Sequence, residues 1–394
     1  MPRLVALDVP WDNAFPGALQ RTWDAGDAAA PLDPRLPAAA ARDLLNALRP
    51  THLLDASGEL TTLDGGLSVD DGDALVMATS GTSAAARGVV LSHAAVRASA
   101  EATSRRLDVD PAQDQWLACI PLSHIGGLGV VTRAMITGTP LQVHERFDAA
   151  RVTAAGRSVT LISLVSAVLS QLDLSMFRLI LLGGAAPPSV VAQNVVTTYG
   201  MTETCGGVVY DGLPLDGTAI SIFAAATPEP TSAPSSPEPT SSGNQPTGEG
   251  EILLRGPSLL RCYRDGTDPL TEGGWFKTGD AGFIDTAGRL HVSGRMSETI
   301  NTGGEKVWPA SVERVLGTHP LVGAIAVDGR PDPKWGQRVV AFVVAKDASD
   351  PPTLDALRDF VSEQLPRWAA PHELVLLAEL PRMPSGKVAK RLLP

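Results

Sequence analysis

The 394-residue sequence is poor in cysteine and in positive charge, and each shortage argues against a class of protein. Its three cysteines, Cys119, Cys205 and Cys262, lie far apart and form no CxxC pair. This argues against a disulfide framework or a structural zinc site and fits a reducing compartment. With 32 basic against 43 acidic residues, the formal net charge is −11. The chain therefore lacks the positive footprint of a general nucleic-acid binder.

Long apolar runs are also missing. The longest stretch, residues 161–172, is interrupted by serines and a glutamine and is too short to span a bilayer. Residues 1–16 contain Asp8 and Asp12 and no uninterrupted apolar core, so they do not resemble a signal peptide. We therefore expect a cytoplasmic protein with no membrane insertion and no nucleic-acid partner.

Apolar residues nevertheless make up 44% of the chain, enough for two or three domain cores. Residues 1–73 are predicted as short helices and loops, and apolar runs then alternate with helical patterns. Buried strands are expected at residues 75–78, 116–120, 159–164, 179–182 and 194–198. Helices are expected between them, at residues 92–106 and 128–137. This alternation predicts an α/β fold with mostly parallel sheets covered by helices.

A segment rich in Pro, Ser, Thr and Glu, residues 224–247, interrupts this pattern. It has too little apolar surface to offset its ordering entropy, so we predict a disordered insert. Beyond it, two strands and a turn before the second of them predict a small β region. The segment from residue 300 onward predicts a small α+β domain. The expected strands are residues 251–254, 289–292, 324–327 and 339–344, the turn is 285–288, and the helices are 309–316 and 353–364.

Five short motifs carry the chemistry. The first follows a strand and offers backbone and hydroxyl donors and a cation to phosphate oxygens. Its residues are Thr79, Ser80, Gly81, Thr82, Ser83 and Arg87. The spacing is not that of a Walker loop, and a plain Ser/Gly surface loop is the structural alternative.

The second motif, residues 199–204, combines an aromatic ring that can stack on a purine, a hydroxyl for phosphate and a carboxylate for Mg²⁺. These groups are Tyr199, Thr202 and Glu203. The alternative is that Tyr199 belongs to the core and Glu203 is merely solvated.

The third motif places Asp280 at an expected Gly-Asp turn, where a carboxylate suits two vicinal ribose hydroxyls. A turn aspartate with only local bonds is the alternative. The fourth comprises Gly294-Arg295 and the glycine-rich residues 300–307, and the fifth is the Ser-Gly-Lys sequence that ends at Lys387. Each motif is weak by itself, but five in one order are not a coincidence.

Together these motifs resemble the adenylate-forming superfamily of acyl-CoA synthetases, firefly-type luciferases and peptide-synthetase adenylation domains, over about residues 75–394. The resemblance implies an N-terminal nucleotide- and acid-binding domain, residues 1–294, and a small mobile C-terminal domain, residues 295–394. It implies a small carboxylic acid as substrate, ATP and coenzyme A as co-substrates, and Mg²⁺ as cofactor. A homodimer is an open expectation for its assembly.

By this resemblance, Thr79–Ser83 bind the phosphates, with Arg87 where the family usually has lysine. The remaining nucleotide contacts are assigned to Gly184, Ala185, Ala186, Tyr199, Gly200, Thr202, Asp280 and Arg295, and the metal contact to Glu203. Lys387 bridges the acid and the α-phosphate, and Thr202, Glu203 and Arg87 complete the catalytic set. Contacts with the acid or coenzyme A are assigned to His124, Gly183, Thr198, Gly303, Gly304 and Lys306.

Within the superfamily, residues 195–212 are similar to the short actinobacterial-type o-succinylbenzoate–CoA ligases of menaquinone biosynthesis. The implied activity is ATP-dependent acid–CoA ligation through an acyl-adenylate, with release of pyrophosphate and o-succinylbenzoate as the acid. Another aryl- or acyl-CoA ligase, an adenylation domain and a non-catalytic nucleotide- or acyl-binding relative stay open as alternatives. For His124, a packed wall residue is the alternative to a substrate contact.

Overall fold

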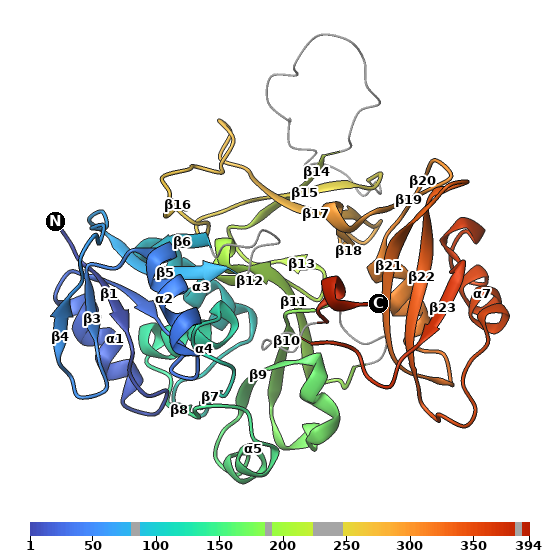
Figure 1. The fold of residues 1–394 in the computed structure, drawn as a ribbon. Helices are drawn as coiled ribbons and strands as arrows, with labels where there is room; N and C mark the ends of the chain where they lie inside the picture. Colours follow the sequence, from blue (N-terminus) through green and yellow to red (C-terminus); the bar gives the residue numbers. More distant parts are fainter. Residues whose placement is uncertain (80–86, 186–190, 224–246, 383–387) are drawn as a thin grey trace. The chain divides into compact units, whose positions relative to one another are not determined.

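The structure is a computed structural model that describes residues 1–79, 87–185, 191–223, 247–382 and 388–394 (Figure 1). Apart from Thr247, the predicted disordered insert lies outside these residues. The chain folds into two compact units. The first unit comprises Met1–Gly184, Ala192–Ile220 and Leu254–Phe276. The second unit comprises Ala185–Val191, Ser221–Leu253 and Lys277–Pro394. The boundary expected between residues 294 and 295 stays a prediction.

The first unit contains a seven-stranded sheet in the order β16-β6-β5-β2-β1-β3-β4. Its strands are β1 Leu4–Leu7, β2 Ala28–Pro31, β3 His52–Leu54, β4 Leu60–Thr62, β5 Asp73–Thr79, β6 Arg87–Ser92 and β16 Cys262–Tyr263. The prediction of only helices and loops over residues 1–73 is therefore wrong. Both β1 and β2 are wholly buried, and a buried parallel strand shows no alternation of polar and apolar residues. A short alanine-rich run then cannot be told from a helix or loop.

A second seven-stranded sheet has the order β13-β12-β11-β10-β9-β7-β8. Its strands are β7 Trp116–Ala118, β8 Leu141–Val143, β9 Leu161–Val165, β10 Leu179–Gly183, β11 Val195–Met201, β12 Gly206–Tyr210 and β13 Leu213–Pro214. The strands from β8 to β11 are all parallel, and β12 and β13 add to them in antiparallel fashion. The expected strands are confirmed here, and the sheet is mostly parallel as predicted.

Helices α3 and α4 lie between these two sheets, as Figure 1 shows. Helix α3 contacts β5, β6 and β12, whereas α4 contacts β7, β9 and β12. Both helices were predicted, and Ser92 caps α3 by accepting a 3.1 Å hydrogen bond from the Ala95 N–H. The helical segments of this unit are α1 Phe15–Asp24, α2 Ala38–Leu48, α3 His93–Arg106, α4 Ile125–Thr137, α5 Ala149–Ala155, η1 Ser166–Gln171, η2 Leu174–Met176 and η3 Thr202–Thr204.

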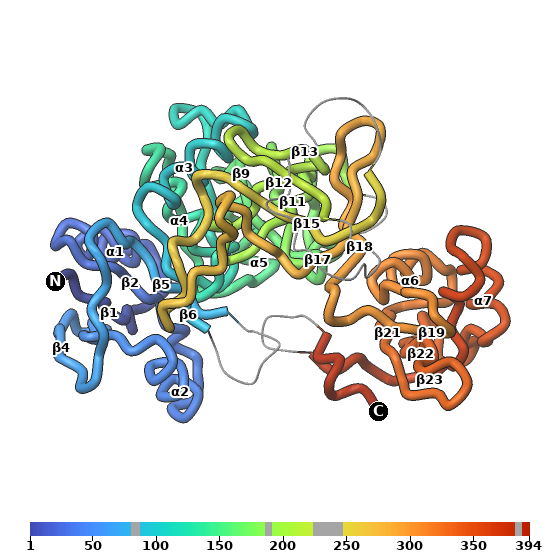
Figure 2. The backbone as a smooth tube through the Cα atoms, turned by 90° about the horizontal axis from the view of Figure 1, so that it is seen from above, coloured from blue at the N-terminus to red at the C-terminus, as the bar shows by residue number. Residues whose placement is uncertain are grey.

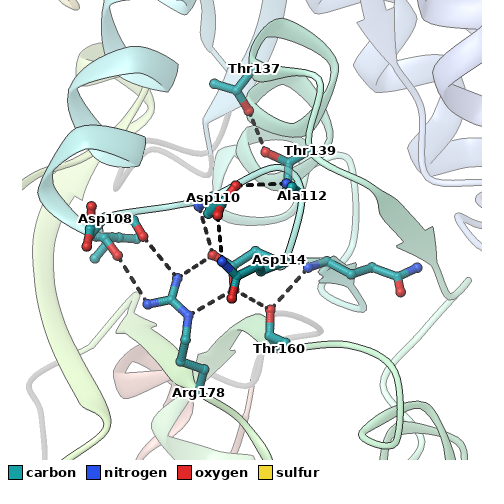
Figure 3. A network of polar contacts seen from close by, with 11 residues as sticks. Asp108, Asp110, Ala112, Asp114, Thr137, Thr139, Thr160 and Arg178 are labelled. Carbon is teal, nitrogen blue, oxygen red and sulfur yellow. Dashed lines mark hydrogen bonds and ion pairs between the residues drawn. The ribbon is translucent and has the colours of Figure 1, made fainter.

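A polar network around Asp114 fixes the end of the second sheet at which the parallel strands begin (Figure 3). The Asp114 carboxylate accepts hydrogen bonds from Thr160 at 2.7 Å and from the Arg178 guanidinium at 2.8 and 2.6 Å. These partners immediately precede β9 and β10. Burial acts to raise the pKa of Asp114, but the bonds from Arg178 and Thr160 outweigh it and keep that pKa below its ordinary value.

A four-stranded sheet, most of it in the second unit, has the order β14-β15-β17-β18. Its strands are β14 Ala219–Phe223, β15 Gly250–Arg255, β17 Phe276–Ile284 and β18 Leu290–Arg295. The predicted turn joins β17 to β18, where the Asp285 and Arg289 backbones are hydrogen-bonded at 3.0 Å. The small β region is thus confirmed.

The last sheet has the order β20-β19-β22-β21, with β23 paired to β22. Its strands are β19 Ile300–Thr302, β20 Glu305–Val307, β21 Val322–Asp332, β22 Gly336–Ala345 and β23 Glu373–Leu376. The helical segments are α6 Pro309–Leu316, α7 Leu354–Ser362, η4 Met296–Glu298, η5 Arg367–Ala369 and η6 Lys390–Leu392. Helices α6 and α7 lie beside β21 and β22 (Figure 2). Their apolar residues pack on one face of the sheet, and Leu380 and Leu393 pack on the other. The predicted α+β character is confirmed.

Candidate active site

The first motif begins where β5 ends and finishes where β6 starts. Thr79 and Arg87 are register partners on these antiparallel strands, and the Thr79 hydroxyl donates to the Arg87 carbonyl at 3.3 Å. Four predicted phosphate-binding residues, Ser80, Gly81, Thr82 and Ser83, lie outside the described residues. The structure therefore places only the two ends of this motif.

The Arg87 guanidinium is fixed by two side chains from residues 263–265. Its Nε and Nη2 donate to Oδ2 of Asp265 at 3.2 and 3.0 Å. Its Cζ lies 3.6 Å from the centroid of the Tyr263 ring, a close cation–π contact. Tyr263 belongs to β16, which pairs with β6 and so brings this ring beside the start of β6. A planar guanidinium can stack on the ring while two of its nitrogens donate to a carboxylate, whereas a lysine ammonium has only one nitrogen.

The same tyrosine also contacts the predicted metal-binding carboxylate. The Tyr263 hydroxyl donates to Oε1 of Glu203 at 3.1 Å. Burial, followed by the neighbouring Glu203 charge, raises the pKa of Tyr263 far above its ordinary value, so the hydroxyl stays protonated and donates. Glu203 is therefore not simply solvated. The sequence motifs gave no sign of Tyr263 or Asp265, because neither belongs to a recognised pattern.

The second motif lies on β11 and on the single turn η3 that follows it. Tyr199 and Thr202 are half-buried, and the backbone between them bulges at Tyr199 and Gly200. A side chain at Gly200 would place its Cβ 1.9 Å from the Gly206 carbonyl oxygen, so only glycine fits. The turn is closed by Thr204, whose hydroxyl accepts from the Met201 N–H at 2.9 Å.

The end of β10 carries the predicted Gly183, Gly184 and Ala185, and Ala186 lies outside the described residues. The Thr198 hydroxyl donates to the Leu182 carbonyl at 3.2 Å. A Cβ on Gly183 would lie only 2.6 Å from this hydroxyl oxygen, so the two strands approach closely here. Glycine allows that approach because it has no Cβ.

His124 directly precedes helix α4 and is exposed. The exposure does not support the alternative of a packed wall residue. Nearby, Gly127 must be glycine, because a Cβ there would lie 2.4 Å from the Ile120 carbonyl oxygen. The contact of His124 with the acid stays a prediction.

In the second unit, Asp280 lies within β17 and not at a turn, so the expected Gly-Asp turn is wrong. Its carboxylate is buried and forms an ion pair with Arg295 on β18, with Nε 2.9 Å from Oδ1. Arg295 also donates from Nη1 to the Thr278 carbonyl at 2.9 Å. The alternative of purely local bonds is excluded too, because strand pairing aligns Asp280 with Arg295. The structure thus joins two residues that the motifs treated separately.

The glycine-rich motif forms the tight hairpin between β19 and β20. Gly303 and Gly304 have φ values of +61° and +90°, a region that favours glycine. The Gly303 N–H donates to the Trp335 carbonyl at 2.8 Å, and a Cβ on Gly303 would lie 2.8 Å from the Trp335 ring. Lys306 on β20 is exposed. Lys387 lies outside the described residues.

Glu203 is the residue proposed to bind magnesium. Within the described ranges, no three His, Cys, Asp or Glu side chains gather closely enough to hold a metal ion. Mg²⁺ keeps several waters and is commonly bound by one or two carboxylates together with substrate phosphates. A single carboxylate at Glu203 is therefore compatible with a Mg²⁺ ion that arrives with ATP.

The chain belongs to the AMP-binding enzyme family. The family model of the AMP-binding enzyme matches residues 67–264, and that of its C-terminal domain matches residues 311–387. Among curated relatives, a Mycobacterium tuberculosis protein named "Probable 2-succinylbenzoate--CoA ligase" is 38% identical over 351 residues, which cover 82% of this chain and 84% of that protein. The 2-succinylbenzoate–CoA ligase of Enterococcus faecalis is 34% identical, over 80% of this chain and 68% of that protein.

A solved structure shows the same fold. The o-succinylbenzoate coenzyme A synthetase of Bacillus subtilis, in complex with its acyl-adenylate intermediate, is 28% identical with a TM-score of 0.82. The match covers 99% of this chain and 87% of that chain. The predicted fold class and the resemblance to adenylate-forming enzymes are confirmed. No helix in the described parts of the chain is long and apolar enough to cross a membrane.

Proposed function

We propose that this protein is an AMP-forming 2-succinylbenzoate–CoA ligase. The likeness to relatives of that name, which extends over 82% of the chain in one case, carries the proposal. The chemistry of the described residues agrees with it, since Arg87 and Glu203 both contact Tyr263. A cation and a carboxylate so arranged suit a nucleotide triphosphate and its magnesium ion. The resemblance of residues 195–212 to o-succinylbenzoate–CoA ligases of menaquinone biosynthesis makes that pathway the proposed setting.

The first half-reaction joins two anions, and this determines what the chain must supply. A carboxylate oxygen of the acid attacks the α-phosphorus of ATP, the bond to pyrophosphate breaks, and an acyl-adenylate forms. Bound Mg²⁺ supplies charge neutralisation on the phosphate oxygens. Arg87 and Lys387 would neutralise the rest, and Thr202 would donate to the α-phosphate. Glu203 would hold the metal, and Asp280 would accept hydrogen bonds from the ribose hydroxyls, with Arg295 beside it.

The second half-reaction transfers the acyl group to sulfur. The thiolate of coenzyme A attacks the acyl carbonyl carbon, and AMP leaves with the electron pair of the broken bond. The hairpin at Gly303 and Gly304 would let the pantetheine arm approach its backbone, since neither residue has a side chain. Lys306 at the edge of this hairpin would interact with the anionic groups of the cofactor.

Three expectations are less specific and belong to the same proposal. The nucleotide- and acid-binding part would comprise residues 1–294, and the part that moves between the half-reactions would comprise residues 295–394. Tyr199 would stack on adenine, with Gly183 to Ala186 along the ring edge, and His124 and Thr198 would face the acid. The protein would work in the cytoplasm, as a monomer or a homodimer, which sedimentation would distinguish.

A panel of acids tests the proposal directly. ATP–pyrophosphate exchange is measured with 2-succinylbenzoate, benzoate, malonate and octanoate, each with Mg²⁺ and without coenzyme A. We expect exchange with 2-succinylbenzoate to exceed that with the other acids by at least about tenfold, the lower end of the discrimination that an apolar pocket achieves. Exchange with another acid alone would replace the proposed substrate, and exchange with none would leave a binding protein.

A further inference from the structure

Tyr263 is placed between the two charged groups that the proposed function assigns to the triphosphate. On one side its ring lies under the Arg87 guanidinium, at 3.6 Å from Cζ. On the other side its hydroxyl donates to Glu203 at 3.1 Å. Tyr263 is buried, with 8% of the residue's surface exposed, so it is a fixed support for both groups.

Asp265 completes the arrangement at the edge of the guanidinium, where two N–H groups donate to it. Its Oδ2 accepts from two nitrogens of Arg87, and its Oδ1 accepts from the Thr267 N–H at 2.9 Å. The Arg87 and Asp265 side chains are 41% and 53% exposed, and ion pairs this exposed contribute little to folding. A pair that adds little to stability but holds the guanidinium in place is better explained by the function of that guanidinium.

We propose that Tyr263 and Asp265 are positioning residues for adenylation: Asp265 and the Tyr263 ring hold the Arg87 guanidinium, and the Tyr263 hydroxyl holds the Glu203 carboxylate. This inference rests on the proposed roles of Arg87 and Glu203. It also accounts for arginine in place of the usual lysine, because only a planar, forked cation can lie flat on the ring and bond Asp265. Tyr263 thereby links the cation proposed to bind phosphate, Arg87, to the carboxylate proposed to bind Mg²⁺, Glu203.

The two halves of the proposal predict different defects. Tyr263→Phe keeps the ring under Arg87 and removes only the donor to Glu203. The Mg²⁺ concentration that half-saturates ATP binding should therefore rise by about tenfold, the lower end of the effect of losing one hydrogen bond to a charged group. Asp265→Asn keeps the Thr267 bond and removes the charge opposite Arg87. Affinity for ATP at saturating Mg²⁺ should fall by about threefold, with the Mg²⁺ requirement unchanged.

Calorimetric titration of the full chain with ATP, at a series of Mg²⁺ concentrations and without acid or coenzyme A, measures both quantities. Tyr210→Phe is the matched control for the first variant, because it removes another buried tyrosine hydroxyl, bonded to Thr103 at 3.1 Å. Glu373→Gln is the control for the second, because it breaks a comparably exposed pair with Arg338. Thermal unfolding of every variant establishes that it is folded.

A double-variant cycle tests the coupling between Asp265 and Arg87. If Asp265 acts only through the guanidinium, Arg87→Gln combined with Asp265→Asn should bind ATP no more weakly than Arg87→Gln alone. Additive losses would overturn the positioning role, as would tighter ATP binding by Asp265→Asn, which would make Asp265 a competitor of phosphate. A Mg²⁺ requirement in Tyr263→Phe equal to that of Tyr210→Phe would overturn the role of the hydroxyl. If the wild-type chain binds ATP but exchanges no pyrophosphate, the proposed function is wrong, whereas the roles of Tyr263 and Asp265 in ATP binding are not affected.

Discussion

Replacing Asp280 by asparagine should separate a ribose ligand from a purely structural ion pair. The carboxylate is buried, with a side-chain exposure of 8%, whereas that of its partner Arg295 is 46%. Arg295 keeps its bond to the Thr278 carbonyl in the variant. Loss of the pair should therefore cost only about 1 kcal/mol of unfolding free energy, near the upper end for pairs with one exposed partner. The variant is expected to fold.

The cost in nucleotide binding should be larger. A carboxylate that accepts bonds from two ribose hydroxyls loses part of two charged hydrogen bonds on conversion to an amide, about 1.5–2 kcal/mol in total. This corresponds to a roughly 10- to 30-fold rise in the Kd for ATP. The assay is calorimetric binding of ATP and of 2′,3′-dideoxy-ATP, which lacks both hydroxyls.

The two nucleotides together make the result decisive. Wild type should bind dideoxy-ATP at least as weakly as Asp280→Asn binds ATP, and the variant should distinguish the two nucleotides less than wild type does. Asp285→Asn is the matched control, since it removes another aspartate of the β17–β18 hairpin, paired with His291 at 2.7 Å. If Asp280→Asn weakens ATP and dideoxy-ATP equally, the ribose role is refuted and the pair is structural.

The remaining predictions concern the other motifs and the fold. Lys387→Ala should abolish pyrophosphate exchange yet spare thioester formation from supplied acyl-adenylate; equal loss of both steps would exclude the assigned role. Gly303→Ala would be strained at φ +61°, with its Cβ 2.8 Å from Trp335, and should slow thioester formation about tenfold while sparing adenylation. Gly288→Ala, also at positive φ but with open space around it, should slow neither reaction. Asp114→Asn should lower the unfolding free energy by about 2 kcal/mol in chemical denaturation at pH 7. The folded-state pKa of Asp114 lies below its unfolded-state pKa of 3.8. The stabilisation by its carboxylate is therefore fully present above pH 3.8 and should vanish as the pH falls through the folded-state pKa. A difference in unfolding free energy between wild type and Asp114→Asn that does not depend on pH would contradict this.

The sequence was most informative where periodicity and capping agree. Helix α3 follows a serine N-cap, and α6 begins at Pro309, so both could be placed within a residue. Strands β1 and β2 were missed because four fully buried residues carry no alternation. Their identity as strands depends on neighbours that are far away in the sequence, which periodicity does not report.

The site divides in the same way. Its family motifs could be recognised because each keeps several residues close together in the chain. Tyr263 and Asp265 could not be recognised in this way. Tyr263 contacts Glu203, which is 60 residues away in the sequence, and Asp265 contacts Arg87, which is 178 residues away. The Asp280–Arg295 pair combines both cases: its members were found from motifs, but their contact depends on strand register.

A single-turnover reaction with 2-succinylbenzoate, ATP, Mg²⁺ and coenzyme A tests the central claim most directly. The account predicts that AMP, pyrophosphate and 2-succinylbenzoyl-CoA appear in equal amounts, and that acyl-adenylate accumulates when coenzyme A is omitted. Formation of ADP and phosphate in place of AMP and pyrophosphate would contradict adenylation. Pyrophosphate and acyl-adenylate without thioester would contradict coenzyme A as the acceptor.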